Sequence, residues 1–375
     1  MKHTVWIWVL VLSILLSGCG MSLEGEYVWE EPHQFPNSPQ VYQETVASDY
    51  ITLYTVLSSA IKLGIRQVTV SVKDYDREAL AEDMERISQH LMSTDPIAAY
   101  AVQEIRCTQG TSGNNPALAV EIDYSRDKAE IARIKRAGDL SAARELIGQS
   151  LNNCESGVVI LIDVFSSVDF EQLVENYAMK WPEYVMECPQ VTVNVFPDSG
   201  RSRVLELKFT YQTSRDALKN MQSQVAPIFA SAELYVRGDG SVHEKYKQLY
   251  SFLMERFSYT LETSITPSYS LLRHGVGDSR AFANVYAAMC RWAGLECMVV
   301  SGTKQGESYF WNIVYDQGVY YHVDLLRSVQ EGSFCQFADE QMSGYVWDYS
   351  AYPACGPREE TDLPHWGEEN FGAPN

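Results

Sequence analysis

The stretch from Gly275 to Gly294, GVGDSRAFANVYAAMCRWAG, decides how the rest of the chain is interpreted. Its first glycines allow a sharp turn, and Asp278 and Ser279 supply side chains that cap a helix N-terminus. The residues that follow are apolar nearly all round, which is typical of a buried helix, and Gly294 suits the C-terminal end of that helix. The sequence therefore predicts a core helix with Ser279 at its positive end, followed by a buried strand over 295–302.

Ser279 has two interpretations. A helix N-terminus stabilises a developing anion through free backbone N–H groups and the helix dipole, so nucleophiles are often found there. Serine at the start of a helix is, however, most often an ordinary capping residue. The pattern favours the cap and keeps the nucleophile as an alternative.

The N-terminus has the features of an export signal. Lys2 is followed by an uncharged apolar run over 5–16, too short to span a bilayer comfortably, that ends in Leu16-Ser17-Gly18-Cys19. These last four residues resemble a bacterial lipobox, whose cysteine is lipidated and becomes the mature N-terminus. A plain secretory signal or an uncleaved anchor are the alternatives. We expect 1–19 to be a lipoprotein signal peptide, with the mature protein outside the cytoplasm and anchored to the bacterial cell membrane through lipid on Cys19.

The chain is strongly acidic, with a formal net charge of −20 over 375 residues. Such a charge is repelled by nucleic acids and by anionic membrane surfaces, so no nucleic-acid partner is predicted.

Eight cysteines are present, and seven remain when Cys19 is set aside. An odd number cannot all pair within the chain, and no Cys/His cluster has the spacing of metal ligands. We therefore predict neither a metal site nor another cofactor. Cys290 falls in the core helix, where a buried thiol is the simplest interpretation. Cys335 and Cys355 could form a bridge, but their spacing alone does not decide it.

The length and composition predict several segments. Residues 20–47 are rich in Pro, Glu, Gln and Ser and are expected to form a flexible tether. A duplicated α/β module is expected over 48–236 and a second domain over 237–356. The acidic segment 357–375 is expected to be a loosely ordered tail.

The proposed duplication rests on a repeated order of helix, strand, helix, strand, strand. The expected elements are 50–63, 68–72, 77–92, 101–107 and 117–124 in the first copy, and 141–152, 158–164, 169–181, 190–196 and 204–211 in the second. In both copies the last strand ends in tyrosine and a Ser-Arg-Asp triplet follows. Neither copy has a phosphate-binding glycine motif, so the module is expected to be a binding module or a scaffold.

Downstream of the core helix, two strands over 309–315 and 319–326 are joined by a turn at 316–318. The alternation of side chains along a strand places His322 and Asp324 on the same face.

The segment from about Val242 to Cys355 resembles bacterial transglutaminase-like proteins, which have a papain-like fold. In that family a helix opens with Gly-Asp-Cys, a His-x-Trp-Asn strand supplies the catalytic base, and a Tyr-His-Val-Asp strand supplies the aspartate that orients it. The matching segments here are Gly277-Asp278-Ser279, Tyr309-Phe310-Trp311-Asn312 and Tyr320-Tyr321-His322-Val323-Asp324. The resemblance implies an α+β chain whose C-terminal domain is transglutaminase-like, with Ser279 and Tyr309 at the nucleophile and base positions and Asp324 retained.

These two replacements weaken the expected chemistry. A serine hydroxyl needs a base within hydrogen-bond reach, and Tyr309 is a poor one because a phenol pKa near 10 keeps it protonated. Tyr309 can instead donate a hydrogen bond to Ser279 or Asp324. His322 and His274 are the candidate replacement bases, although a packed or solvent-facing histidine is the commoner situation for each. The remaining residues of the matched motifs, Asp278, Trp311 and Asn312, are expected to support the cleft.

Three functions follow from this interpretation. The preferred one is a lipid-anchored, catalytically inactive homologue that keeps the fold and binds an extended peptide or a cell-wall-associated ligand. The second is a serine-dependent acyl hydrolase or amidase that uses Ser279, with His322 or His274 as base and Asp324 orienting it. The third is a structural surface protein that acts through the duplicated module.

Overall fold

A computed structural model describes residues 45–357. The expectations about the signal peptide with Cys19, about most of the tether and about nearly all of the acidic tail lie outside these residues. Within the described part of the chain, no helix combines the length and apolar character needed to cross a membrane.

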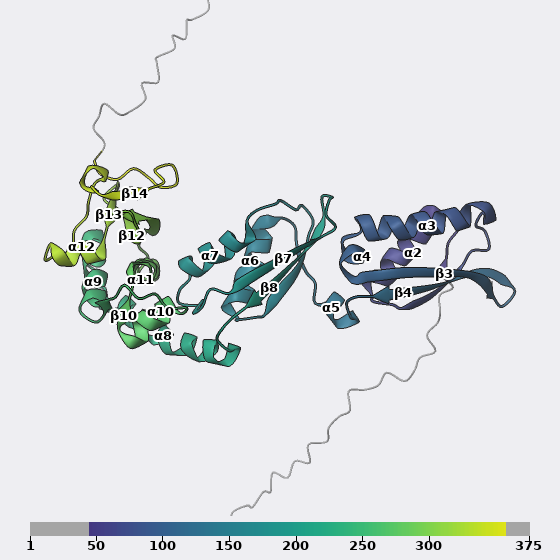
Figure 1. Cartoon of the computed structure of the whole chain (residues 1–375), viewed down its shortest axis with the longest axis horizontal. Helices are drawn as coiled ribbons and strands as arrows, with labels where there is room; N and C mark the ends of the chain where they lie inside the picture. Colours follow the sequence, from purple (N-terminus) through teal and green to yellow (C-terminus); the bar gives the residue numbers. More distant parts are fainter. Residues whose placement is uncertain (1–44, 358–375) are drawn as a thin grey trace, which may run out of the picture. The chain divides into compact units, whose positions relative to one another are not determined.

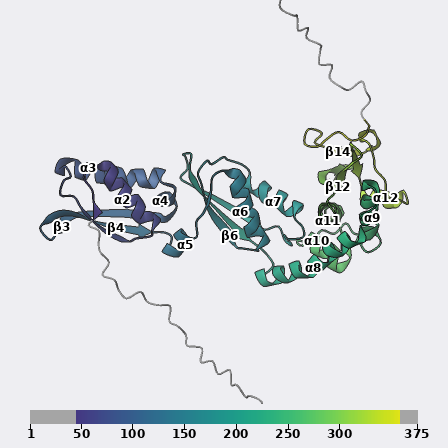
Figure 2. The ribbon, with the colours of Figure 1, turned by 180° about the vertical axis from the view of Figure 1, so that it is seen from behind.

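The first part of the fold is a four-stranded sheet with helices on one face, drawn from purple to blue in Figures 1 and 2. The strand order is β1-β2-β4-β3. Its elements are β1 (Thr45–Val46), α2 (Tyr50–Lys62), β2 (Gln67–Ser71), α3 (Arg77–Thr94), α4 (Pro96–Ala101), β3 (Val102–Ser112) and β4 (Asn115–Tyr124). Helix α4 was not predicted. Asp95 caps it by accepting from the N–H groups of Ile97 and Ala98, and Pro96 occupies its first turn.

The next part has the same strand order, β5-β6-β8-β7. Its elements are α5 (Lys128–Ala132), β5 (Lys135–Ala137), α6 (Leu140–Asn152), β6 (Gly157–Ile162), α7 (Phe170–Lys180), β7 (Gln190–Phe196) and β8 (Arg203–Thr210). Apolar side chains on one face of this sheet form a core with α6 and α7. The shared order is compatible with a duplication, but the duplication itself stays a prediction.

Two helices lead to the C-terminal part, which contains a second kind of sheet with the order β13-β12-β11-β14. The elements are α8 (Arg215–Tyr235), α9 (Val242–Met254), β9 (Ser258–Tyr259), α10 (Pro267–Tyr269), a π-helical turn η1 (Ser270–His274), β10 (Val276–Gly277), α11 (Ser279–Trp292), β11 (Cys297–Lys304), β12 (Glu307–Asp316), β13 (Val319–Val323), α12 (Leu325–Gln330), η2 (Asp339–Gln341) and β14 (Tyr345–Trp347). The helices and strands together make an α+β chain.

Helix α11 lies at the centre of the C-terminal core, as the glycine turn and the apolar run predict. Asp278 caps it by accepting from the N–H of Ala281 at 2.8 Å. Between Ser279 and Cys290 every residue of the helix except Arg280 is buried. Gly277 is tightly enclosed: an added Cβ would lie 3.0 Å from the Cβ of Ala281, so a side chain fits only if its neighbours shift by a few tenths of an ångström. The turn before the helix therefore holds the backbone close against its first turn.

The predicted strand 319–326 is too long. β13 ends at Val323, and Asp324 is the N-cap of α12. The Asp324 carboxylate accepts from the N–H groups of Leu326 and Arg327, which turns the backbone into a helix at this point. Asp324 is therefore a helix cap at the end of the strand rather than a residue within it.

Candidate active site

Ser279 occupies the first position of α11 and is 8% exposed. Its Oγ accepts a hydrogen bond from the backbone N–H of Phe310 at 3.3 Å. Phe310 belongs to β12. It lies beyond the part of β12 that pairs with β13, because the last residue of β13, Val323, pairs with Asn312. Within residues 45–357 this is the only hydrogen bond of the Ser279 side chain, so no base is in contact with its hydroxyl.

Tyr309, at the position of the family's base, is also buried. Its hydroxyl donates to Oδ1 of Asp324 at 3.0 Å, which is one of the two hydrogen bonds that we considered for it. Burial, followed by the neighbouring Asp324 charge, raises the pKa of Tyr309 above its ordinary value. The phenol therefore stays protonated and acts as a hydrogen-bond donor, not as a base.

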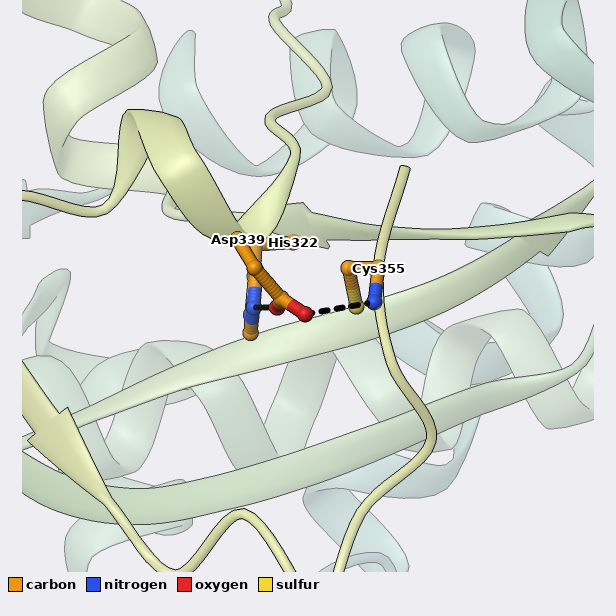
Figure 3. Close-up of side chains that lie close together, drawn as sticks. All are labelled: His322, Asp339 and Cys355. Atoms are coloured by element: carbon orange, nitrogen blue, oxygen red, sulfur yellow. Dashed lines mark hydrogen bonds and ion pairs between the residues drawn. The ribbon is translucent and has the colours of Figure 1, made fainter. Parts of the chain in front are cut away.

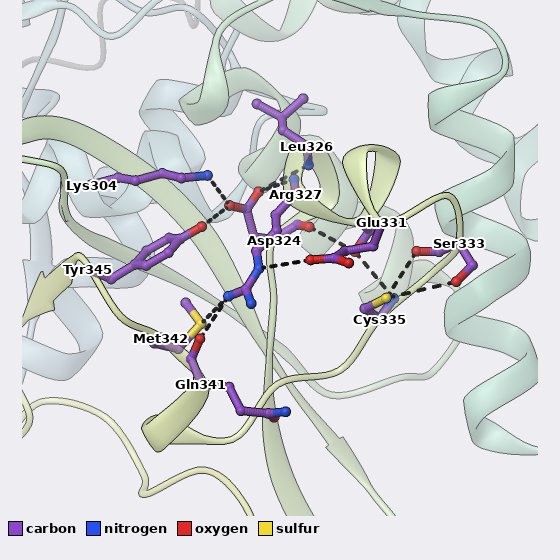
Figure 4. Close-up of polar contacts among 11 residues, drawn as sticks. Lys304, Asp324, Leu326, Arg327, Glu331, Ser333, Cys335, Gln341, Met342 and Tyr345 are labelled. Atoms are coloured by element: carbon purple, nitrogen blue, oxygen red, sulfur yellow. Dashed lines mark hydrogen bonds and ion pairs between the residues drawn. The ribbon is translucent and has the colours of Figure 1, made fainter.

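The carboxylate of Asp324 is buried and accepts hydrogen bonds from five donors, most of which are drawn in Figure 4. Oδ1 accepts from Tyr309 Oη and from the N–H groups of Leu326 and Arg327, while Oδ2 accepts from Lys304 Nζ at 2.9 Å and Tyr345 Oη at 2.5 Å. The Lys304 ammonium compensates the buried negative charge. Asp324 thus orients two tyrosines and a lysine, and among residues 45–357 no imidazole is hydrogen-bonded to it.

His322 is fully buried, and both of its ring nitrogens are engaged. Nδ1 accepts from the indole N–H of Trp311 at 2.9 Å, and Nε2 lies 2.8 Å from Oδ1 of Asp339. Because an indole N–H can only donate, Nδ1 carries no proton, and Nε2–H donates to Asp339. Burial lowers the pKa of His322, opposed by the hydrogen bond and charge of Asp339. The ring is therefore a neutral part of the core and does not serve Ser279 as a base.

His274 ends η1 and is exposed. Its ring meets that of Tyr269 edge-on, with centroids 5.5 Å apart. Its side chain makes no hydrogen bond to Ser279 in the described part of the chain. The structure therefore brings neither candidate imidazole into hydrogen-bond contact with the serine.

The cavity beside Ser279 is small, about 10 Å³. Asp324 also lines it, together with Phe310 and Trp311. A volume of this size holds about one water molecule. The structure thus brings the nucleophile and aspartate positions to one cavity but leaves no room there for a peptide.

Residues 230–325 match the model of the transglutaminase-like superfamily. This chain carries a transglutaminase-like domain. The matched residues include all three triad positions, Ser279, Tyr309 and Asp324. No curated protein matches the chain.

Similar solved structures include one named "Putative Cysteine Protease from Cytophaga hutchinsonii", which is 16% identical and has a TM-score of 0.25. That match covers 42% of this chain and 70% of the other. A second structure, named as a TGase, is 11% identical and has a TM-score of 0.26; the match covers 58% of this chain and 63% of the other chain. At such low TM-scores these likenesses add no argument, and the assignment rests on the family model.

The other motif residues of the transglutaminase-like domain are supports. Trp311 is 1% exposed and packs edge-on against Tyr345 and Trp347. The Nδ2 of Asn312 donates to the backbone oxygen of Ala283 at 2.9 Å, which ties β12 to α11. These contacts hold the sheet against the central helix.

Lys304 and Tyr345 were missed from the sequence, although both contact Asp324. Lys304 Nζ lies 4.7 Å from the ring centroid of Tyr309 and 5.0 Å from that of Tyr345, which adds cation–π attraction to the ion pair. The expected strand ended at Gly302, whereas β11 extends to Lys304 and pairs it with Tyr345 of β14. Had the strand been predicted to extend to residue 304, the alternation of side chains would have placed Lys304 on the same face as Gly302. Gly302 pairs with Tyr309, so Lys304 could have been recognised as a neighbour of the site.

A third group of side chains meets beside the site, as Figure 3 shows. Ligand atoms of His322, Asp339 and Cys355 lie within 4.8 Å of one another. Burial raises the pKa of the Cys355 thiol to about 12, and Oδ2 of Asp339 accepts from the N–H of Cys355 at 3.0 Å. A neutral imidazole binds a metal through an unprotonated nitrogen, but Trp311 fixes the proton on Nε2. The donor set in this arrangement is a hydrogen-bonded brace rather than a preformed metal centre.

The cysteines considered for a bridge are both free thiols. The Sγ of Cys335 contacts the backbone oxygen of Ser333 at 3.3 Å, and that of Cys355 contacts the oxygen of Pro353 at 3.7 Å. Cys290 is a buried thiol in α11, as expected.

Proposed function

We propose that this chain is a catalytically inactive transglutaminase-like protein that acts by binding a peptide or a cell-wall-associated ligand. One observation supports the inactive part: in the described part of the chain the Ser279 hydroxyl contacts no base, and the aspartate that would orient a base is bonded to Lys304 and two tyrosines. In comparable acyl-transfer enzymes, removing nucleophile and base costs several orders of magnitude in rate. The alternative, a serine-dependent acyl hydrolase or amidase, lacks the contact that it most needs.

Ser279 is expected to resist a fluorophosphonate probe, because an unactivated serine hydroxyl is a weak nucleophile. The chain from Gly20 onward would be treated with the probe and any adduct mapped by mass spectrometry, with Ser279→Ala as the control. An adduct on Ser279 that is absent from the control would contradict the proposal of an inactive protein and favour the serine hydrolase. No adduct, in a sample whose circular dichroism shows it to be folded, supports inactivity.

The proposal includes a lipid anchor on the mature N-terminus. It is supported by the residues at 16–19, which resemble a lipobox. We expect protein extracted from bacterial membranes to begin at Cys19 and to carry acyl chains, and Cys19→Ala to move the protein out of the membrane fraction. Intact-mass measurement and fractionation test both outcomes. An unmodified N-terminus elsewhere in the chain would exclude the anchor.

The third function, action through the module over 48–236, is favoured by one comparison. The cavity beside Ser279 has a volume of about 10 Å³, whereas a cavity of about 650 Å³ lies on the sheet that contains β6 and β8. Sites for small ligands usually have volumes of about 300–1,000 Å³. If the protein binds a ligand, the module has the space that the degenerate site lacks.

A further inference from the structure

The larger cavity lies on the face of the sheet β5-β6-β8-β7 opposite the one that packs on α6 and α7. Part of this face is covered, because Leu161 and Val204 are buried in the core of the first part of the fold. Its wall is formed by the start of β6 with the two residues before it, the middle of β8, Tyr100 of α4, residues of α5 and the turn after it, Lys135 of β5, and the first residue of α8. None of its lining residues lines the cavity beside Ser279. It is therefore a separate candidate site.

Basic side chains gather in this wall, although the whole chain has a net charge of −20. The four that line the cavity are Arg133, Lys135, Lys208 and Arg215. A concentration of cations on an otherwise acidic protein creates a local positive field, which attracts anions.

The carboxylates of the same wall are already engaged. Glu206, whose side chain is 6% exposed, accepts from Arg126 at 3.0 Å and from Asn194 at 2.9 Å. Glu130 accepts from the N–H of Asp127 and caps α5. These bonds use part of the acceptor capacity of both carboxylates.

Glu155 pairs with Lys135 at 3.8 Å, and Lys208 lies 3.7 Å from Glu206. Both lysines of the wall are therefore already paired with carboxylates. Any cationic groups left for a ligand must come from the two arginines.

These two arginines keep free donors. Arg133 is exposed, and its side chain has no hydrogen bond or ion pair within residues 45–357. Arg215 uses only Nε, which donates to the backbone oxygen of Asn153 at 3.2 Å. The terminal nitrogens of both guanidinium groups are thus available, and their planar arrangement suits two-point binding of a carboxylate or phosphate.

We propose that this cavity binds an acidic peptide whose carboxylates pair with Arg133 and Arg215. Its volume of about 650 Å³ is far larger than a single inorganic anion needs and falls in the usual range of ligand sites, so it can hold a short peptide with more than one carboxylate. The inference rests on the proposed function only in that the chain acts by binding.

The test is calorimetric titration of the folded chain from Gly20 with the peptide Glu-Glu-Glu, at low and at physiological ionic strength. Arg133→Gln and Arg215→Gln are each expected to weaken binding about tenfold or more, because each removes hydrogen bonds between charged groups. The matched control is Arg136→Gln, which makes the same charge change on β5 at an exposed position outside the cavity.

Equal weakening in Arg136→Gln would mean that the peptide responds only to overall charge, and it would overturn the site. Binding of inorganic phosphate that depends on Arg133 and Arg215, without binding of the peptide, would replace the peptide by a phosphate ligand. If neither the peptide nor phosphate binds at low ionic strength, the proposal is wrong. The fluorophosphonate result is independent of this titration, so either proposal can fail without the other.

Discussion

Asp324→Ala is expected to lower the free energy of unfolding by about 3 kcal/mol or more, since it breaks a buried ion pair by removing one partner. The substitution leaves the Lys304 ammonium without its carboxylate and takes the acceptor from two buried tyrosine hydroxyls. It also removes the N-cap of α12. Lys304 is 25% exposed and can regain some hydration, which limits the loss.

The measurement is equilibrium urea unfolding of the folded part of the chain. Asp324→Asn is the matched variant, because it keeps an acceptor for the helix cap but loses the charge. We expect its free energy of unfolding to lie between those of the wild type and Asp324→Ala. Asp348→Ala, at an exposed position, should leave the unfolding midpoint close to that of wild type. An unchanged midpoint in Asp324→Ala would show that the five-donor network contributes no net stability.

Trp311→Ala is expected to cost about 3–5 kcal/mol of stability, the usual range for truncating a buried aromatic side chain. Trp311 is 1% exposed, packs edge-on against two aromatic rings and donates its indole N–H to His322. Trp311→Phe keeps most of the ring volume but removes the donor. Its expected loss is about 1–2 kcal/mol, because it leaves a buried acceptor unpaired.

Urea unfolding gives both losses, and nitrogen NMR of the His322 ring adds a direct test of the hydrogen bond. In the wild-type protein the proton should be found on Nε2, as the indole donor requires. A proton on Nδ1 in the wild type would contradict the assigned contact. Equal stabilities of the Ala and Phe variants would show that ring packing contributes little at this position.

The central helix and the hairpin could be predicted because their signals are local. The glycine turn, the N-cap Asp278 and the apolar run that follows define α11 within twenty consecutive positions. The capping role favoured for Ser279 is wrong, because Asp278 is the N-cap and the Ser279 Oγ accepts from Phe310 instead. The strands β12 and β13 are separated by a short turn, so their pairing also follows from neighbouring residues. These same segments carry the motifs of the triad positions, which is why the family could be predicted from sequence.

The contacts of the site could not be predicted in the same way, because their partners come from distant parts of the chain. Lys304 and Tyr345 meet Asp324 only after β14 has paired with β11. Asp339 reaches His322 from η2, which follows α12, and accepts the proton that the indole of Trp311 leaves on Nε2. Periodicity along one segment contains no information on such pairings. The local sequence around Asp324 is compatible with a strand residue and with a helix N-cap, and in the structure Asp324 is the N-cap of α12.

The Lys304–Asp324 pair also bears on what a Cys-His-Asp triad at these positions would need. Cysteine at 279 and histidine at 309 would supply the side chains that the transglutaminase-like motifs have at these positions, but the residues around them would be unchanged. The oxygen atoms of Asp324 would still be shared among a cation, a tyrosine and two backbone amides. An imidazole at 309 would have to compete with them for the same carboxylate. A Cys-His-Asp triad at these positions would therefore require changes in the residues that bond Asp324 as well as in the triad itself.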